Sequence, residues 1–363
     1  MTSMTRKTKL SYLDVIRAIS CIAIVLFHYS YTFFEYGIPG NGPNFLRFAG
    51  GDWGGVFVAV FFMISGASIW YNHDEAMSFK DILTFWKKRW FSLFPAFYIA
   101  WIIMYVINSR KLGIWNWGGP RKNYLFTLFG MDGYFSHLGQ NYYCLGEWFL
   151  GAIIWLYFLY PLLALAFRKF RIGSTLIITF IDVFNLYRNA FSSSPDTNIF
   201  IVLIKYYNSH ITISDNMCLW TCIMNFWLGM LFITYREKLI NRYTSIAALI
   251  ITVFFANAET AVPKIIVCTL LAFCMMIMLA YESYILENNT MIMKFVKQIS
   301  KYSYGIFLVH HVILYAVMEK FRYVRFNTLT SLLLFIPIFV LISAIGSILV
   351  TITNLVISKL NVI

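Results

Sequence analysis

The segment that decides the fold runs from residue 12 to residue 33 and reads YLDVIRAISCIAIVLFHYSYTF. It is almost continuously apolar, and it is long enough for a helix of roughly 20 residues to cross a hydrocarbon layer of about 30 Å. Asp14, Arg17 and His28 interrupt the apolar run. Because an ionisable side chain is costly to bury at membrane depth, we expect these three residues to face the interior of a helix bundle.

Helical spacing predicts that Arg17 and His28 lie on one face of this helix. Eleven positions at about 100° each end roughly 20° past three full turns, with a rise of roughly 16 Å, and Asp14 joins the same face one turn before Arg17. In the functional interpretation, His28 is a general base, because imidazole titrates near neutrality, and Arg17 contacts an anion or organises the site. The structural alternative is a buried Arg–Asp pair and a hydrogen-bonded core histidine.

The composition of the whole chain is that of a membrane protein. Of 363 residues, 60% are apolar and 12% are charged, against about 45–50% and about 25% in soluble domains. The net charge of +13 comes from 29 Lys and Arg against 16 Asp and Glu. These basic residues lie between apolar blocks and form no extended basic domain, so membrane lipids are the expected surroundings and a nucleic-acid partner is not expected.

The apolar blocks predict an all-α integral membrane protein, with about ten transmembrane helices in a single domain over residues 1–363 and no appended soluble domain. No internal repeat is evident. The last block is long enough to be tilted, broken at Pro337 or Gly346, or split in two. The predicted spans are 12–33, 54–71, 90–108, 146–167, 172–190, 216–235, 243–258, 262–281, 302–319 and 329–357.

The distribution of basic residues predicts a cytoplasmic N-terminus. With that orientation, seventeen Lys and Arg lie on the cytoplasmic side and eleven on the opposite side, with Arg17 inside the first span. Cytoplasmic loops carry the excess of Lys and Arg in membrane proteins. The basic N-terminal stretch resembles a signal peptide, but Asp14 and Arg17 interrupt the apolar run that follows, so a retained first helix is expected.

The cysteines give no sign of a metal site. Five of the six (Cys21, Cys218, Cys222, Cys268 and Cys274) fall inside apolar blocks, and none belongs to a C-x-x-C pair. Their spacing indicates neither a disulfide framework nor a zinc site, and no metal cofactor is expected.

Five segments together resemble the membrane-bound acyltransferase-3 family, whose members O-acylate surface polysaccharides, lipopolysaccharide, peptidoglycan and related acceptors. The Arg17-x10-His28 spacing looks like the opening signature of that family, and the phenylalanine-rich run ending in Ser65-Gly66 is similar to its second segment. Small residues there permit close helix packing, which is the role we expect for them. The segments, in family order, are 12–28, 57–66 (FVAVFFMISG), 85–95 (FWKKRWFSLFP), 146–152 (GEWFLGA) and 299–310 (ISKYSYGIFLVH).

The third segment resembles the basic R-x-x-R motif of the family. Arg89 matches the first arginine, but Ser92 stands where the second is usual, so the anion site is either incomplete or completed by Lys87 or Lys88. A cationic cluster at the inner mouth of a helix suits the phosphates of acyl-CoA. The alternative is a positive-inside anchor at the lipid headgroups.

The resemblance singles out two further residues. Glu147, near the start of the fourth span, would orient a histidine or bind acceptor hydroxyls, or else it is a solvated residue favoured by the helix dipole. His310 ends the late Ser-Tyr-Gly helix of the family. Adjacent His311 points about 100° away around that helix, so both histidines are not expected to serve one site.

The resemblance implies a membrane O-acyltransferase of the bacterial cytoplasmic membrane. It would move an acyl group, most commonly acetyl in the family, from cytoplasmic acyl-CoA to a hydroxyl of a cell-surface polysaccharide or of its lipid-linked glycan precursor. His28 would act as general base or as a covalent acyl relay. No G-x-S-x-G signature is present.

Acceptor contacts are expected in segment 109–145, which concentrates aromatic and amide side chains; the same aromatic residues could instead be membrane-interface anchors. They are Trp115, Asn116, Trp117, Tyr134, Asn141, Tyr142 and Tyr143. The competing classes are a multi-pass transporter or flippase, which predicts internal repeats, and a glycan polymerase, which would be indifferent to CoA.

Overall fold

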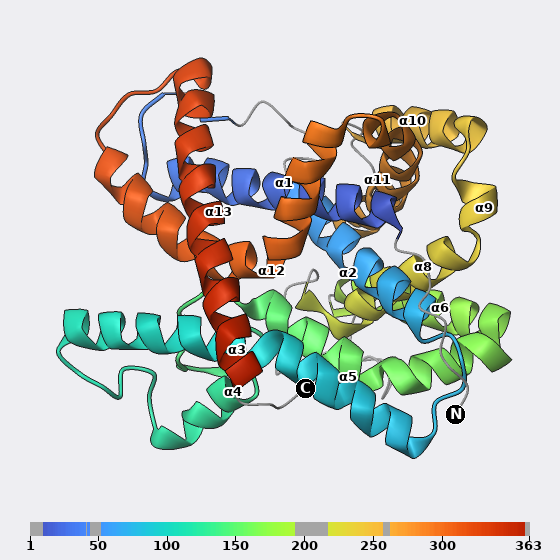
Figure 1. The fold of residues 1–363 in the computed structure, drawn as a ribbon, viewed down its shortest axis with the longest axis horizontal. Helices are drawn as coiled ribbons and strands as arrows, with labels where there is room; N and C mark the ends of the chain where they lie inside the picture. Colours follow the sequence, from blue (N-terminus) through green and yellow to red (C-terminus); the bar gives the residue numbers. More distant parts are fainter. Residues whose placement is uncertain (1–9, 41, 44–51, 193–216, 257–261, 360–363) are drawn as a thin grey trace.

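The computed structural model describes residues 10–40, 42–43, 52–192, 217–256 and 262–359, with the side chains of 188–192 excepted. Within these ranges the chain is helical, and β-pairing is limited to one isolated bridge between Gly40 and Phe326. The stretch 191–215, which the predicted spans leave between 172–190 and 216–235, lies almost entirely outside the described residues. The all-α class predicted from the apolar blocks is confirmed (Figure 1).

Each of the ten predicted segments contains a helix. Among the described residues, seven helices are long and apolar enough to cross a membrane, namely α1 (Ser11–Glu35), α2 (Trp53–Asn72), α3 (Phe79–Leu112), α5 (Trp148–Lys169), α11 (Lys264–Glu287), α12 (Thr290–Met318) and α13 (Thr328–Lys359). The shorter apolar helices are α8 (Leu219–Thr234) and α10 (Arg242–Ala256), and α6 (Arg171–Ser192) fills the remaining predicted segment. The count of ten spans therefore stays a prediction.

Two helices begin much earlier than the apolar blocks predict. α3 starts at Phe79, where Ser78 and Asp81 form a reciprocal capping box, and α12 starts at Thr290, where the Asn289 side chain accepts from two backbone N–H groups. Polar caps fix helix starts independently of hydropathy. The basic stretches 80–89 and 294–301, which lie between predicted spans, are consequently helical. The last block is one unbroken helix that contains Pro337.

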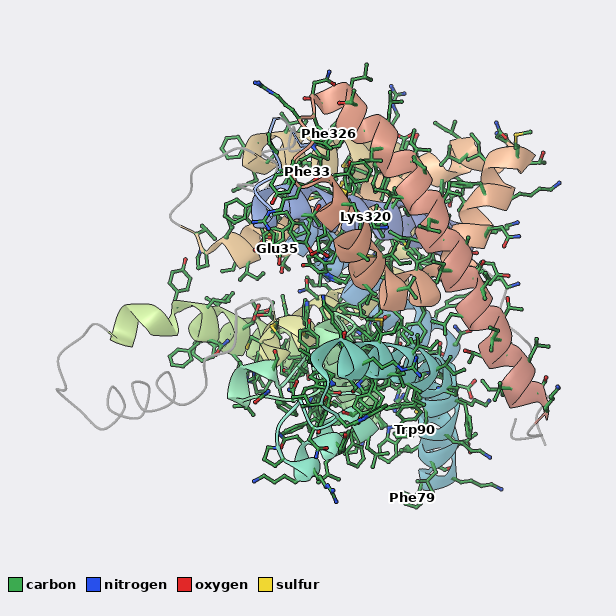
Figure 2. The ribbon with its side chains drawn as sticks, turned by 90° about the vertical axis from the view of Figure 1, so that its left-hand side faces the viewer. Phe33, Glu35, Phe79, Trp90, Lys320 and Phe326 are labelled. Atoms are coloured by element: carbon green, nitrogen blue, oxygen red, sulfur yellow. The ribbon has the colours of Figure 1, made fainter. Side chains whose placement is uncertain are left out.

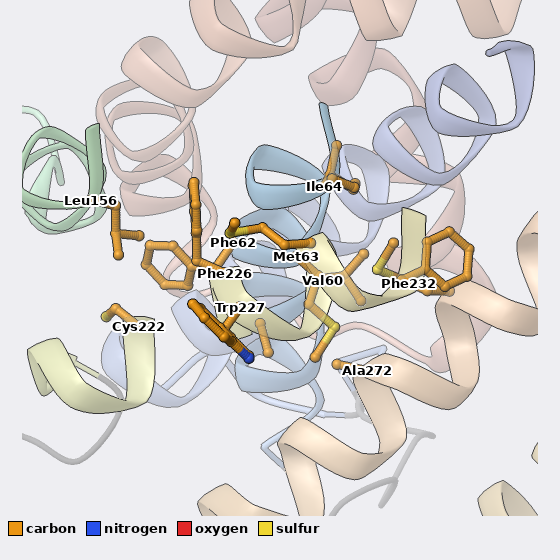
Figure 3. Packing of buried hydrophobic residues seen from close by; sticks show 14 of the residues in the cluster. Val60, Phe62, Met63, Ile64, Leu156, Cys222, Phe226, Trp227, Phe232 and Ala272 are labelled. Carbon is orange, nitrogen blue, oxygen red and sulfur yellow. The ribbon is translucent and has the colours of Figure 1, made fainter. Parts of the chain in front are cut away.

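The central packing contact joins α2 to α8 at two glycines. A Cβ on Gly66 would lie 2.0 Å from the carbonyl oxygen of Phe226, and a Cβ on Gly229 would lie 1.9 Å from that of Met63. Only glycine allows two helix backbones to approach this closely. Buried aromatic and aliphatic side chains, including Phe62 and Trp227, fill the space around the contact (Figure 3). The packing role predicted for Gly66 is confirmed.

Helix α1 packs against α2, α11 and α12, with a smaller contact to α13. At its C-terminal end, the rings of Phe33 and Phe326 pack edge to face with centroids 5.6 Å apart, and the Tyr29 hydroxyl donates to the Ser331 carbonyl over 2.8 Å. Figure 2 shows Phe33 and Phe326 together, well away from Phe79 at the start of α3. Protein therefore covers one side of the helix that carries Arg17 and His28, whereas Tyr31 and Phe34 near its C-terminal end are exposed.

The glycine contact generates a stability prediction. Gly66→Ala should lower the melting temperature of the detergent-solubilised protein by several degrees, corresponding to roughly 1–3 kcal/mol of overpacking, because the added methyl group meets backbone and not a flexible side chain. Gly173→Ala is the matched control, since a Cβ at Gly173 would meet no heavy atom of the described residues within 4 Å outside its own stretch of helix. Equal melting temperatures for the two variants would contradict the close approach.

Candidate active site

A cavity of about 320 Å³ opens inside the bundle between α1, α2, α3, α5 and α12. Both Arg17 and His28 line it, together with Arg89 of α3 and His310 of α12. The shared face predicted from the spacing of Arg17 and His28 is therefore the face that α1 turns to the cavity. Since the two residues are eleven positions apart on one helix, the cavity extends roughly 16 Å along α1.

One end of the cavity is organised by a hydrogen-bonded network around Arg17. Its Nη1 donates to the Ser300 hydroxyl over 3.2 Å and lies 3.4 Å from Asp14 Oδ1, and its Nη2 donates to Ser68 over 3.4 Å. The Ser300 hydroxyl in turn donates to Asp14 Oδ1 over 2.6 Å. Asp14 is 3% exposed. The network ties α1 to α2 and α12 and fixes the guanidinium, so the predicted Arg–Asp pair exists, and its Arg17 member lines the cavity.

Arg89 lies at the same end of the cavity as Arg17. The Tyr304 hydroxyl, one turn after Ser300 on α12, donates to the Leu93 carbonyl over 2.9 Å, and Leu93 is one turn after Arg89 on α3. The Arg89 guanidinium sits over the rings of Phe85 (5.1 Å) and Tyr157 (5.5 Å). Planar guanidinium groups stack on aromatic faces in this way while keeping N–H groups for an anion.

The other residues of the basic motif divide into two groups. Ser92 lines the cavity, although its hydroxyl bonds back to the Arg89 carbonyl over 2.8 Å. Lys87 and Lys88 are exposed and are not among the lining residues. The expectation that a neighbouring lysine completes the anion site is not met inside the cavity. The second fixed cation in its lining is Arg17, which sequence reasoning assigned to a different motif.

The opposite end of the cavity is formed by three imidazoles. The ring centroids of His28 and His310 are 5.2 Å apart, those of His28 and His311 are 4.0 Å apart, and those of His310 and His311 are 4.3 Å apart. One ring nitrogen from each residue lies within 4.8 Å of the others. The α1 and α12 helices thus run side by side, with Arg17 beside Ser300 and His28 beside His310.

The expectation that His310 and His311 cannot serve one site is wrong. Their Cα–Cβ bonds diverge around α12, but each ring reaches back toward the cavity, and both residues line it. Gly146 makes room for the His311 ring, because a Cβ there would lie 2.3 Å from His311 Cδ2. The angular rule considers backbone directions alone, whereas side-chain rotamers bring neighbouring rings together.

The hydrogen bonding of His310 defines its tautomer. Its Nδ1 lies 2.6 Å from the carbonyl oxygen of Phe307. A carbonyl only accepts, so Nδ1 carries the proton and the Nε2 of the neutral ring is left with a free lone pair. His310 is 1% exposed, and its Nε2 has no hydrogen-bond partner among the described residues. A buried lone pair of this kind suits a proton acceptor or a ligand to a cation.

Glu147 is not solvated. Among the described residues, no hydrogen bond joins it to a histidine side chain. It is 0% exposed, and its Oε2 accepts from the Leu145 N–H over 2.8 Å. Its neighbours Gly146 and Trp148 line the cavity, whereas Glu147 does not. The interpretation of Glu147 as a solvated helix-start residue is therefore wrong, and its contact with the site runs through the backbone of Gly146.

The segment expected to contact an acceptor is largely structural. Tyr134, Asn141 and Tyr142 are buried, and Tyr142 stacks on Tyr124 with centroids 4.1 Å apart. Side chains this far inside the fold offer little surface to a glycan, so burial argues against an acceptor contact at these three positions. Four members remain exposed or partly exposed, namely Trp115, Asn116, Trp117 and Tyr143.

Comparison with known proteins identifies the family. The model of the acyltransferase domain family, acyltransferase-3, matches residues 10–352, and the chain belongs to this family. Curated proteins and solved structures give no match. The chain is therefore an acyltransferase with several membrane-crossing helices, and the transporter and polymerase alternatives are not supported.

A pH prediction follows from two buried carboxyl groups outside the spanning helices, in the segment between α3 and α5. Burial, with a further contribution from the nearby Asp132, raises the pKa of Glu147 to about 8, and burial raises the pKa of Asp132 to about 6. In the unfolded chain both titrate near about 4. Between the pKa in the unfolded chain and the raised pKa in the folded protein, the folded state binds more protons than the unfolded state. The free energy of unfolding therefore falls as pH rises through this range.

Glu147→Gln should remove much of that fall. Between about pH 5 and about pH 9, the melting temperature of the wild type is expected to decrease more steeply than that of Glu147→Gln, by an amount equivalent to a few kcal/mol. Glu237→Gln, at an exposed side chain, is the control and should parallel the wild type. Parallel curves for Glu147→Gln and the wild type would contradict the assignment.

Proposed function

We propose that the protein transfers an acyl group, above all acetyl, from cytoplasmic acyl-CoA to a hydroxyl of a cell-surface polysaccharide or its lipid-linked precursor. The site of transfer is the cavity between Arg17 and His28, in the bacterial cytoplasmic membrane. The observation that carries the proposal is the distribution of ionisable side chains along this cavity, with two guanidinium groups toward one end and three imidazoles at the other.

The guanidinium end suits the donor. Acyl-CoA carries its phosphates at one end and its thioester at the end of a pantetheine arm that extends roughly 20 Å. Arg89 and Arg17 offer charge-assisted hydrogen bonds to phosphate oxygens, and the exposed Lys87 and Lys88 add positive charge at the mouth. The arm would then follow the cavity for the roughly 16 Å that separate Arg17 from His28. This orientation requires a cytoplasmic N-terminus, in agreement with the excess of basic residues on that side.

The imidazole end suits the transfer. An unprotonated nitrogen of His28 takes the proton from the acceptor O–H, and the oxygen attacks the thioester carbonyl carbon. The C–S bond breaks, the acyl group forms an ester with the acceptor, and CoA leaves as a thiol after receiving the proton. The lone pair on His310 Nε2 can accept the N–H of His28 and hold its ring in the required tautomer.

A covalent route uses the same residues. His28 would attack the thioester first, form an acyl-imidazole with release of CoA thiol, and then pass the acyl group to the acceptor hydroxyl. On the covalent route, enzyme carrying the labelled acyl group forms in the absence of acceptor. On the direct route it does not.

Loss of the base should abolish transfer. Membranes that contain the protein are incubated with acetyl-CoA labelled in the acetyl group, and label is measured in extracted surface glycan. His28→Ala is expected to reduce the rate by at least about 100-fold, the ordinary contribution of a positioned general base. His137→Ala, a histidine outside the cavity lining, is the control. Undiminished transfer by His28→Ala would refute the role of this residue.

Arg89 should act on donor binding. Arg89→Ala is expected to raise the KM for acetyl-CoA by about 10-fold to 100-fold, the range for losing a charged hydrogen-bonding group, with normal amounts of folded protein. Lys87→Ala, two residues earlier but outside the cavity lining, should raise it far less. Loss of expression in Arg89→Ala would support the alternative, in which this residue is a headgroup anchor.

A further inference from the structure

The imidazole end of the cavity has the chemistry of a metal site. His28, His310 and His311 each offer one ring nitrogen, and these atoms lie within 4.8 Å of one another. Imidazole is the ligand of choice for zinc and neighbouring transition metals, whereas magnesium and calcium require oxygen ligands. Three histidines with a fourth position open to a cavity form the ligand set of an accessible zinc site.

The second ligand shell of His310 already has the arrangement that metal sites use. A metal-bound histidine ordinarily donates its other ring N–H to a carbonyl or carboxylate, which fixes the tautomer and aims the free nitrogen at the ion. His310 Nδ1 makes this bond to the Phe307 carbonyl over 2.6 Å. The remaining Nε2 is buried without a partner among the described residues, and the residue lines the cavity.

The other two rings can converge on the same point. Nitrogens in a tetrahedral zinc site lie 2.0–2.1 Å from the ion and hence about 3.4 Å from one another. The three nitrogens lie within 4.8 Å of one another, so they would have to approach by up to about 1.4 Å. A change of side-chain rotamer at His28 and His311 would supply this movement. Gly146 leaves the His311 ring the space it occupies, and the Tyr315 ring stacks beside it with centroids 5.8 Å apart.

We propose that His28, His310 and His311 form a binding site for Zn²⁺ and similar borderline-soft divalent cations, and that occupancy of this site inhibits acyl transfer. Zinc would use the lone pair of His28, so the same residue cannot also take a proton from an acceptor. The inhibitory part of this proposal rests on the proposed function, while the binding part does not.

The charges of the cavity argue for a reversible site. No carboxylate of the described residues lines it, and two of its lining residues, Arg17 and Arg89, carry fixed positive charges. A divalent cation in this cavity is therefore repelled by like charges and has no anionic ligand to offset them. The affinity should be well below that of a closed structural zinc site, and a chelator should remove the ion.

The direct test measures binding without any acyl donor. Protein purified in detergent without a polyhistidine tag is titrated with Zn²⁺, and with Co²⁺ as a spectroscopic probe, by calorimetry and visible absorption. We expect one saturable site per chain and the absorption of four- or five-coordinate cobalt, with no competition from excess Mg²⁺. Absence of saturable binding by the wild type would overturn the proposal regardless of any variant.

Variants locate the site. His311→Ala and His28→Ala should each weaken Zn²⁺ binding by about 100-fold or more, since loss of a mere outer-shell partner already costs 10-fold to 100-fold. His137→Ala should bind as the wild type does. Melting temperatures and elution profiles identify any variant that has failed to fold. If one of the two ligand variants fails to fold, Zn²⁺ binding by the other tests the site. Unchanged binding by folded His28→Ala and His311→Ala would overturn the proposal.

Inhibition is tested separately in the acetyl-transfer assay. Saturating Zn²⁺ should suppress transfer by the wild type at least 10-fold, and a chelator should restore it. Stimulation by Zn²⁺ would overturn the inhibitory role. If the protein binds Zn²⁺ but transfers no label from acetyl-CoA, the proposed function fails while the metal site stands. If the protein transfers label but binds no Zn²⁺, the metal site fails while the proposed function stands.

Discussion

The structure depends on the cost of placing charged and polar groups inside an apolar helix bundle. α1 carries an aspartate, an arginine and a histidine through the region where water is excluded, and each needs a partner or a cavity. Asp14 and Arg17 meet this requirement through Ser68 and Ser300 on two other helices. His28 meets it in a cavity shared with two more histidines. The polar residues of α1 therefore determine which helices must surround it.

Close packing elsewhere leaves room for this cavity. The glycine contact between α2 and α8 holds these two helices at backbone distance and concentrates the large aromatic core on one side of α2. The other face of α2 contributes Phe61, Ser65 and Ser68 to the cavity lining. The same helix thus combines a tightly packed face with a face that borders the site, and the position of α1 against α2 is set by both.

Periodicity alone predicted the central feature of the site. The spacing of Arg17 and His28 predicts one helix face, and the structure has both residues on one cavity. The apolar blocks likewise predicted helices in all ten segments. They missed the starts of α3 and α12, because Ser78 and Asn289 cap these helices outside the apolar runs.

Tertiary contacts account for what the sequence did not predict. The convergence of His310 and His311 depends on rotamers and on the space left by Gly146 in a different helix connection. The presence of Arg89 with Arg17 in one cavity lining, in place of a neighbouring lysine, depends on how α3 packs against α12. The hydrogen bond from the Tyr304 hydroxyl to the Leu93 carbonyl joins these two helices. Burial of Tyr134 and Tyr142 also follows from contacts that composition does not encode, since aromatic residues are equally common at interfaces and in cores.

The most direct test of the central claim is a cryo-electron microscopy structure of the protein in lipid nanodiscs with a non-hydrolysable acetyl-CoA analogue. The account predicts density for the phosphates beside Arg89 and Arg17 and density for the acetyl group within about 4 Å of a ring nitrogen of His28, where a near-attack geometry must lie. Density for the analogue in the separate groove lined by Arg121 and Lys122, with the cavity between Arg17 and His28 free of ligand, would contradict it.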